Sequence, residues 1–402
     1  MDGMIWLDRK KKKLIKVASI LALIIISIEI FIINFYIKSN KTENVFFNGI
    51  NAYEITNDGY VVVGSNNNND KHYEKAEISV YDNSKNKKLV KVYNKGYNST
   101  FYGVLCTDDG YVAVGSYEST KQESENKVRT ALIVKYDLSG NVIFENDFQV
   151  LGNSKFTNVV STYDGFIVVG QSIYENDTIG LSNNGGAVII KYDKDGKEIW
   201  RKNYGGSKSA LYNDLTIYNN YIYAVGKDGN NMGIITKFSL EGDLVYNENY
   251  SNVDSIGFTS IVNNNDSLYV CGGKSEGNSK QAIILKYNKD CKLIDEVTYQ
   301  SNSNDRYNSL TIDENGNVIA VGTISNKTES KDYSYDGIIG KYNSDLKELA
   351  VVKYTNDRST YFNDVKYYDG KYLVIGNSQR EDLSVVAKFF FFSTSLKSLG
   401  VN

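Results

Sequence analysis

The chain is poor in the residues that most often carry chemistry: it has no proline, one histidine, three cysteines and two tryptophans in 402 residues. A lone histidine, His72, excludes a histidine-based triad and a multi-histidine metal centre, and we expect it in a solvent-facing loop. We therefore assign no catalytic residue, no metal site and no cofactor. The absence of proline accompanies abundant Asn, Lys, Ile and Tyr, which is typical of an AT-rich genome such as that of a low-GC Gram-positive bacterium.

The three cysteines, Cys106, Cys271 and Cys291, are odd in number and widely spaced. This spacing argues against a disulfide framework or a zinc site. Cys271 and Cys291 belong to the same sequence repeat, described below, so a bridge between these two is the one disulfide that the sequence leaves open.

Positive charge is concentrated at the N-terminus. The formal net charge is −3, and residues 1–38 hold seven basic and three acidic residues, which leaves −7 for the rest. An acidic domain of this kind is not suited to nucleic acid or to an anionic membrane surface. We predict no nucleic-acid partner.

Long apolar runs are absent except for one, the 21 residues from Val17 to Ile37. As a helix this run crosses about 30 Å of hydrocarbon. Six basic residues precede it and only Lys38 and Lys41 follow closely, so the N-terminus is expected in the cytoplasm. We predict a cytoplasmic tail (1–16), a signal-anchor helix (17–37), a short linker (38–46) and an extracellular domain (47–402), single-pass in the cell membrane.

Two alternatives to a plain anchor remain open. A cleaved signal peptide is disfavoured because the apolar run is long and no small-x-small cleavage pattern follows it. Glu29 lies within the run, and it is either a residue tolerated in a single anchor or one that pairs the helix with a partner.

A seven-residue motif recurs seven times in the rest of the chain, first as Asp58–Gly64. It begins with Asp, Asn or Gly, continues with an aromatic position that is not kept in every copy and an apolar run, and ends with glycine. The final glycines are 46 to 56 residues apart, at Gly64, Gly115, Gly170, Gly226, Gly272, Gly322 and Gly376. An aromatic residue followed three positions later by an aliphatic one precedes each motif, as in Phe47/Ile50 and Phe101/Val104. Periods of this length indicate one supersecondary unit copied along the chain.

Each copy holds four short runs rich in Val, Ile, Tyr and Phe, separated by Asn, Asp, Gly and Ser. These are strand and turn signals, and no helical period is sustained beyond the N-terminus. Seven units of four antiparallel strands predict an all-β fold, a seven-bladed β-propeller preceded by one transmembrane helix.

One column of the repeat holds the candidate ligand-binding residues. It lies one position before the aliphatic residue of the first strand, where all members are small or polar: Gly49, Gly103, Asn158, Asp214, Ser260, Ser309 and Asp364. Innermost strands crowd the axis of a propeller, so Asp214, Asp364 and Asn158 are predicted to face a central channel and to bind a ligand there. The alternative is that these positions are solvated strand-entry residues.

Three further patterns favour structural roles. A lysine column is expected to pack its stems on apolar surface and keep its ammonium groups hydrated: Lys135, Lys191, Lys237, Lys286, Lys341 and Lys388. The segment Asp193–Glu198 resembles part of a calcium loop but lacks ligands, so a plain hairpin turn is preferred. After Ala387 the seventh copy runs into four phenylalanines, which predicts a degraded outer strand, with a reading-frame slip as one hypothesis for its origin.

The segment Lys191-Tyr-Asp-Lys-Asp-Gly196-Lys-Glu-Ile-Trp200 resembles a repeat of secreted bacterial and archaeal propellers, and Gly272-Gly273 is similar to a kelch glycine pair. The resemblance spans Phe47 to about Lys388 and extends to quinoprotein-type propellers. The tryptophan column of that repeat reads Phe144, Trp200, Tyr246, Asp295 and Ala350 here. The resemblance implies the propeller fold and leaves the function open, because propellers bind, scaffold and catalyse.

The sequence favours a non-catalytic binding or scaffold module for protein or glycan partners at the cell surface. The alternative is an extracellular carbohydrate-active enzyme, a hydrolase or lyase, that uses carboxylates at the channel mouth. An asymmetric carboxylate cluster on one face of the disc would favour the enzyme.

Overall fold

In the computed structural model one compact unit, Val45–Val401, carries all the strands. The structure describes residues 49–66, 73–119, 128–148, 152–172, 186–204, 210–250, 253–277, 279–299, 304–327, 333–355, 357–380 and 385–401. A search of these ranges finds no helix that is long and apolar enough to cross a membrane. The apolar run 17–37, His72 and Phe47 lie outside the described residues.

Seven four-stranded sheets make up the domain. Blades 1 to 4 contain β1 (Gly49–Thr56), β2 (Gly59–Asn66), β3 (Lys75–Asp82), β4 (Lys87–Val92), β5 (Ser99–Thr107), β6 (Gly110–Glu118), β7 (Arg129–Asp137), β8 (Val142–Phe148), β9 (Ser154–Thr162), β10 (Gly165–Ser172), β11 (Gly186–Asp193), β12 (Glu198–Tyr204), β13 (Leu211–Tyr218), β14 (Tyr221–Lys227), β15 (Gly233–Ser239) and β16 (Leu244–Tyr250). Blades 5 to 7 contain β17 (Ser255–Asn264), β18 (Ser267–Glu276), β19 (Ser279–Asn288), β20 (Leu293–Tyr299), β21 (Asp305–Ile312), β22 (Val318–Lys327), β23 (Tyr333–Tyr342), β24 (Glu348–Tyr354), β25 (Ser359–Tyr368), β26 (Lys371–Gln379), β27 (Val385–Ser393) and β28 (Ser398–Val401).

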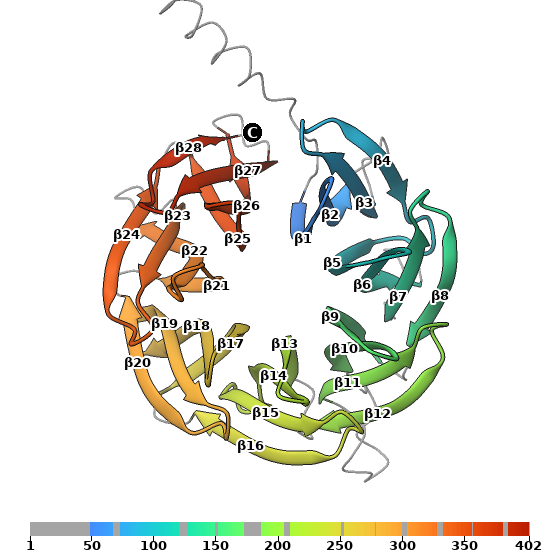
Figure 1. Ribbon diagram of the computed structural model, residues 1–402, viewed down its shortest axis with the longest axis horizontal. Helices are drawn as coiled ribbons and strands as arrows, with labels where there is room; N and C mark the ends of the chain where they lie inside the picture. The colour runs from blue at the N-terminus through green and yellow to red at the C-terminus, as the bar shows by residue number, and fades with distance from the viewer. Residues whose placement is uncertain are drawn as a thin grey trace, which may run out of the picture. The chain divides into compact units, whose positions relative to one another are not determined.

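The blades stand around a ring, with the first strand of each blade nearest the axis and the fourth at the rim (Figure 1). Every blade is antiparallel and its strands follow sequence order, so no described strand crosses from one blade to another. This arrangement confirms the predicted seven-bladed β-propeller of four-stranded antiparallel blades.

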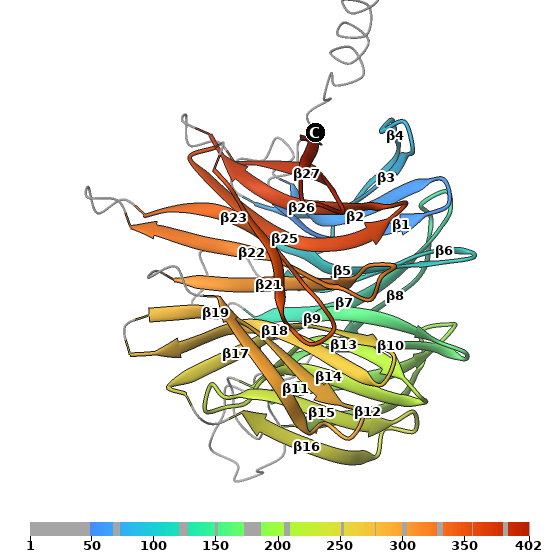
Figure 2. The same ribbon diagram turned by 60° about the vertical axis from the view of Figure 1, so that its left-hand side comes forward.

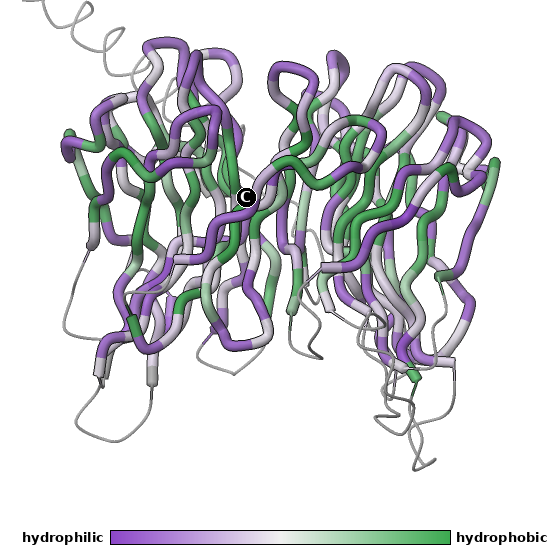
Figure 3. Tube along the Cα trace, turned by 90° about the horizontal axis from the view of Figure 1, so that it is seen from below, coloured by the Kyte–Doolittle hydropathy of each residue, from purple (hydrophilic) through white to green (hydrophobic). Residues whose placement is uncertain are grey.

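The strands run across the thickness of the ring (Figure 2), which gives the domain two faces. The turn face carries the tight turns between first and second strands and between third and fourth strands. The loop face carries the connections between second and third strands and between blades. Hydrophobic residues fill the middles of the strands and hydrophilic ones gather at the turns (Figure 3).

Apolar side chains pack between the blades rather than within a single central core. One cluster of buried residues joins each neighbouring pair of blades, seven clusters in all around the ring. Second and third strands lie between two such clusters, and all nine residues of β6 are buried. This double cover explains why the sequence shows continuous apolar runs instead of strict alternation.

The final glycine of the repeat motif is required by a close approach of two backbones. A Cβ at Gly115 would lie 2.0 Å from the carbonyl oxygen of Thr100 on the innermost strand. The same contact, between 1.8 and 2.2 Å, exists at all seven repeat glycines. A β-bulge in the innermost strand directly follows this point in every blade, so the glycine and the bulge belong together.

The predicted alignment of blade 1 is wrong by three residues. Ile50 pairs with Gly64 just as Phe101 pairs with Gly115, so Ile50, not Phe47, is the counterpart of the aromatic residue. Ala52 is then the counterpart of Gly103. Gly49 does not belong to the predicted ligand column, and Ala52 takes its place.

The seventh blade is more regular than predicted. Its last turn has the same hydrogen bonds as the others, since Ser393 N–H donates to the Lys397 carbonyl at 2.9 Å and Leu396 N–H to Ser393 at 2.8 Å. The outer strand β28 is shortened to four residues. Phe389, Phe390 and Phe392 are all buried in the strand before it.

Candidate functional site

A cavity of about 330 Å³ lies on the axis and is lined by residues of the innermost strands. We call it the channel cavity. Asn158, Asp214 and Asp364 all line it, together with Ser260 and Ser309 of the same column. The structure therefore brings the three sequence-predicted residues into one cavity, although they come from β9, β13 and β25.

The Asp214 carboxylate is fully engaged with the channel wall. Its Oδ1 accepts hydrogen bonds from the Asn158 side chain at 2.5 Å and from Leu215 N–H at 2.8 Å. Its Oδ2 accepts from Ile261 N–H at 2.9 Å. Desolvation raises the pKa of Asp214 despite these bonds. Asp214 thus links blades 3, 4 and 5, and it has little capacity left for a ligand.

Asp364 holds the same position in blade 7 but accepts fewer hydrogen bonds. Its Oδ1 accepts from the Ser309 hydroxyl at 2.5 Å and from Val365 N–H at 2.8 Å. Among the described residues no donor reaches its Oδ2. This second oxygen is available to a group that enters the cavity.

An ion pair stands next to Asp364 across the joint between blades 7 and 1. Lys366 Nζ lies 2.7 Å from Glu54 Oε1, and both side chains are about one-third exposed. Burial acts to lower the pKa of Lys366, but Glu54 and Asp364 outweigh it and raise the pKa. Desolvation raises the pKa of Glu54 in spite of Lys366. The cavity therefore holds an asymmetric group of charges on one side.

Sequence reasoning missed this pair, although a signal existed. Glu54 and Lys366 lie two residues after Ala52 and Asp364, and a period of two places them on the same face of the strand. The corresponding residues of the other five blades are Leu105, Val160, Thr216, Val262 and Thr311. Charge occurs at this position only in blades 7 and 1.

The bulge residues were also missed, and they form a ring of hydrogen bonds around the channel. Each lies directly after the aromatic residue of its innermost strand, and six of the seven side chains donate to a carbonyl of the next blade. The distances run from 2.6 to 2.8 Å. Asn363 of blade 7 donates to Ile50 of blade 1, so the series also crosses the joint between the last blade and the first. The members are Asn51, Tyr102, Thr157, Asn213, Thr259, Asn308 and Asn363, of which Tyr102 makes no such bond.

The lysine column is structural, but its ammonium groups are paired instead of hydrated as predicted. Lys135 is 5% exposed and its Nζ lies 2.6 Å from Asp109. Lys191 pairs with Asp164 at 2.8 Å. Lys388 does not belong to the column. In blade 6 the column residue Lys341 pairs with Ile319. The corresponding pair in blade 7 is Leu373 with Phe391, so Phe391 holds the column position there.

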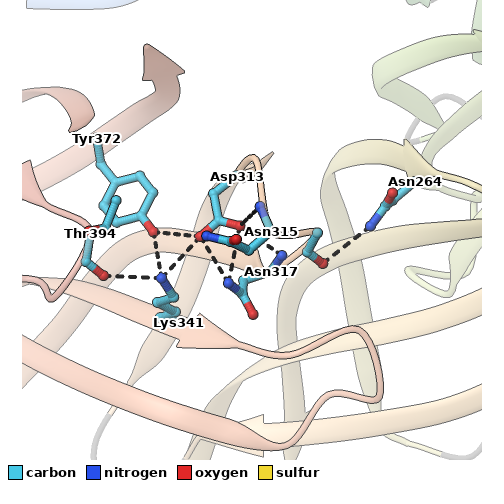
Figure 4. A network of polar contacts seen from close by, with 8 residues as sticks. Asn264, Asp313, Asn315, Asn317, Lys341, Tyr372 and Thr394 are labelled. Atoms are coloured by element: carbon cyan, nitrogen blue, oxygen red, sulfur yellow. Dashed lines mark hydrogen bonds and ion pairs between the residues drawn. The ribbon is translucent and has the colours of Figure 1, made fainter. Parts of the chain in front are cut away.

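The lysine of blade 6 is part of a buried polar network (Figure 4). The Asp313 carboxylate accepts from Lys341 at 3.0 Å, from the Tyr372 hydroxyl at 2.8 Å and from Asn317 N–H at 2.9 Å. Lys341 also donates to the Thr394 carbonyl at 3.0 Å. Burial opposes ionisation, but these bonds outweigh it and lower the pKa of Asp313 to about 2. The Asp313 carboxylate, the Lys341 ammonium group and the Tyr372 hydroxyl are all paired within the chain, which indicates a structural role at the joint of blades 6 and 7.

Other candidate chemistry is weak in the described part of the chain. Cys106, Cys271 and Cys291 are free, so no bridge joins the last two, and burial raises the pKa of each thiol to about 12. Within the described ranges no group of three His, Cys, Asp or Glu residues is placed to hold a metal ion. Asp193 caps a hairpin turn by accepting from Asp195 and Lys197 N–H.

No protein-family model matches the chain, and no curated protein matches it in sequence. Among solved structures, the WD40 β-propeller domain of Doa1 aligns with a TM-score of 0.51 and 10% identity, over 85% of this chain and 92% of that one. A putative 6-phosphogluconolactonase from Bacteroides fragilis aligns with a TM-score of 0.51 and 12% identity, over 84% and 93%. The structure of YjhT aligns with a TM-score of 0.43 and 10% identity, over 75% and 95%.

These likenesses concern the fold alone. The chain is a seven-bladed propeller similar to WD40 and lactonase-type propellers. The predicted resemblance to secreted propeller repeats holds at the level of the fold, and no family is assigned. Known propellers include both binding scaffolds and enzymes, so function has to be argued from the site.

Proposed function

We propose that this chain is a membrane-anchored binding module at the cell surface, and that its propeller receives a polar group of a protein or glycan partner in the channel cavity. One observation carries the proposal: the open Oδ2 of Asp364 lies in a cavity of about 330 Å³, beside the Glu54–Lys366 ion pair. A sugar hydroxyl or a basic side chain would donate to this oxygen.

The states of the three carboxylates favour binding over catalysis. Hydrolysis by a carboxylate pair needs one free acid and one free nucleophile or base. Asp214 is saturated by the channel wall and Glu54 is paired with Lys366. Asp364 keeps an oxygen that no described donor reaches, which suffices to hold a ligand, whereas the ion pair of Glu54 with Lys366 denies it a free acid as partner.

A carbohydrate-active enzyme is the second candidate, and one observation favours it. Desolvation raises the pKa of Glu54, and a raised pKa is what a carboxylic acid needs to act as a general acid. In this alternative Glu54 protonates the leaving group and Asp364 is its partner.

One experiment separates the two candidates. The full chain, purified in a neutral detergent, is incubated with an array of cell-envelope glycans, and both retention and bond cleavage are measured. Binding without cleavage, lost in Asp364→Ala and kept in the turn variant Asp195→Asn, supports the module. Cleavage that disappears in both Glu54→Gln and Asp364→Asn would establish the enzyme.

The location is a separate part of the proposal. It rests on the apolar run Val17–Ile37 and the basic residues before it. Protease treatment of intact cells should degrade the propeller and leave an N-terminal tag protected. Protection of the propeller itself would place it in the cytoplasm and refute this part.

A further inference from the structure

A second cavity, of about 430 Å³, opens where the innermost strands begin, towards the loop face. We call it the basic cavity. Asn213 and Thr259 line both this cavity and the channel cavity, so the two are neighbours along the axis. The basic cavity spans blades 3 to 6.

The lining of the basic cavity has the opposite charge from the domain that contains it. Lys155, Lys227, Lys280 and Arg306 line it, against one carboxylate, Asp305. Asp305 is 1% exposed. Residues 39–402 have a formal charge of −7, so four cations gathered in one cavity are a local reversal.

No carboxylate of the described residues neutralises these cations. In the described part of the chain none of the four lies in an ion pair with the oxygens of Asp or Glu, and Lys227 donates instead to the Asn231 amide oxygen at 3.2 Å. Burial, and then the positive charges of Arg129 and Lys227, lower the pKa of Lys155. Such mutual repulsion is relieved by a bound anion.

Gly257, which also lines the basic cavity, is an independent sign of a ligand. Lys155, Leu211, Gly257 and Arg306 hold the same position in blades 3 to 6, one residue before the aromatic. A Cβ at Gly257 would meet nothing within 4 Å, and Gly257 pairs with Gly273 across the sheet. Neither close packing nor a positive φ requires glycine at position 257. A strand that carries no side chain at this point lets a ligand approach its backbone.

We propose that the basic cavity binds a phosphate oxyanion, with Lys155 and Arg306 as its two principal charges and the Gly257–Gly273 backbone as its floor. Arg306 offers the planar fork that matches phosphate oxygens, and Lys155 supplies a point charge from the other side. The phosphate arrives either as a free ion or as the headgroup of a lipid or surface polymer. This site is distinct from the channel cavity and does not depend on the function proposed for it.

The test uses the full chain in a neutral detergent and isothermal titration with two probes. Pyrophosphate represents the free ion, and glycerophosphoglycerol represents a phosphodiester headgroup without its acyl chains. We expect saturable binding of at least one probe, weakened by salt. Lys155→Gln and Arg306→Gln should each weaken it by about tenfold or more. Gly257→Val should block it by filling the cavity.

Matched controls keep the test specific. Gly49→Val changes the same ring position in blade 1, where a Cβ has only Ser65 Oγ nearby at 3.8 Å, and it should leave binding unchanged. Lys347→Gln removes an exposed cation from the turn face and Asp364→Asn alters the channel; neither should affect phosphate. Binding of one probe identifies the source of the phosphate. Absence of binding for both probes, or binding that survives all three cavity variants, overturns the proposal.

Discussion

Asp214 and Asp364 occupy the same position in blades 4 and 7, yet their carboxylates meet different neighbours. Both oxygens of Asp214 face N–H donors, whereas Asp364 turns one oxygen to the cavity. An amide in place of Asp214 must point its NH₂ group at another donor. An amide in place of Asp364 can keep its oxygen on Ser309 and turn its NH₂ group to the open side.

This difference predicts opposite outcomes for two identical substitutions. Asp214→Asn should lower the free energy of unfolding by about 1–3 kcal/mol, because a donor is left facing a donor. Asp364→Asn should cost less than about 1 kcal/mol but abolish partner binding. Urea denaturation and binding, measured on both variants, check the pair. A destabilised Asp364→Asn with normal binding would reverse the two assignments.

The two aspartates that pair with Lys341 and Lys135 also differ, by burial. The Asp313 side chain is 0% exposed and that of Asp109 is 63% exposed. Removing the charge of Asp313 leaves Lys341 without its buried carboxylate. We expect Asp313→Asn to cost about 3 kcal/mol and the matched control Asp109→Asn less than about 1 kcal/mol.

The pH dependence of this pair follows from the lowered pKa of Asp313. Its value is about 2 in the folded chain, against 3.8 for an unperturbed carboxyl group. The contribution of the ionised group is therefore complete above about pH 4 and is lost as the pH falls towards about 2. The stability gap between wild type and Asp313→Asn should shrink by about 2 kcal/mol over that interval. A constant gap would contradict the lowered pKa.

At the level of elements, the turn between the third and fourth strands packs on the residue that the preceding blade places in the tryptophan column. Each such turn holds a residue at positive φ. Where the preceding blade has Phe144 or Trp200 the residue is glycine, and a Cβ at Gly242 would lie 2.8 Å from Trp200. Where the preceding blade offers Ala350, the turn has Leu396 instead, and the two lie in one apolar cluster. At this joint the large side chain of Leu396 compensates for the small side chain of Ala350.

Replacing the pair Ala350/Leu396 by tryptophan and glycine, as in the pair Trp200/Gly242, tests this complementarity. Ala350→Trp alone should destabilise the domain by about 1–3 kcal/mol through overpacking, and Leu396→Gly alone by about 3 kcal/mol through a cavity. The double variant reproduces the Trp200/Gly242 arrangement and should recover to within about 1 kcal/mol of wild type. Thermal denaturation of the three variants provides the measurement; strictly additive losses would mean that the two positions do not share a space.

The number and order of the strands followed from the repeat, because its period and its four apolar runs leave one architecture. The register of blade 1 did not follow from the repeat. Ile50 and Tyr53 exchange the large and small sizes found in the other blades, and both pack in one cluster with Phe389 of blade 7. The combined side-chain volume is conserved only across the joint between blades 1 and 7, and the spacing of residues in the sequence does not show this. The same error hid Glu54, whose place depends on that register.

For the molecule as a whole, no strand among the described residues is shared between blades 1 and 7, where the ring closes. Closure rests on one apolar cluster, the Tyr53 hydroxyl bond to Leu373 O at 2.6 Å, and the Asn363 bond to Ile50. The Glu54–Lys366 pair lies at the same joint. The side of the channel that we propose to bind a ligand therefore lies at this joint, which we call the seam.

The seam should be the first part of the ring to open when it is weakened. Phe389 is 1% exposed and contacts the rings of Tyr53 and Tyr60, so Phe389→Ala should cost about 3–5 kcal/mol. Hydrogen exchange should then increase first in β1 and β26. Phe258→Ala, equally buried in blade 5, serves as the control and should leave that seam protected. Uniform loss of protection around the ring in Phe389→Ala would contradict closure by this cluster.

Crosslinking in living cells shows whether the channel receives a partner. A photoreactive amino acid is placed at Thr311, which lines the channel cavity, or at Leu244, which is 56% exposed on the rim. We expect a partner to be crosslinked from position 311 and not from position 244, and the crosslink to be lost when Asp364→Asn is added. Crosslinks that arise only from the rim, or that persist in the Asp364→Asn chain, would contradict it.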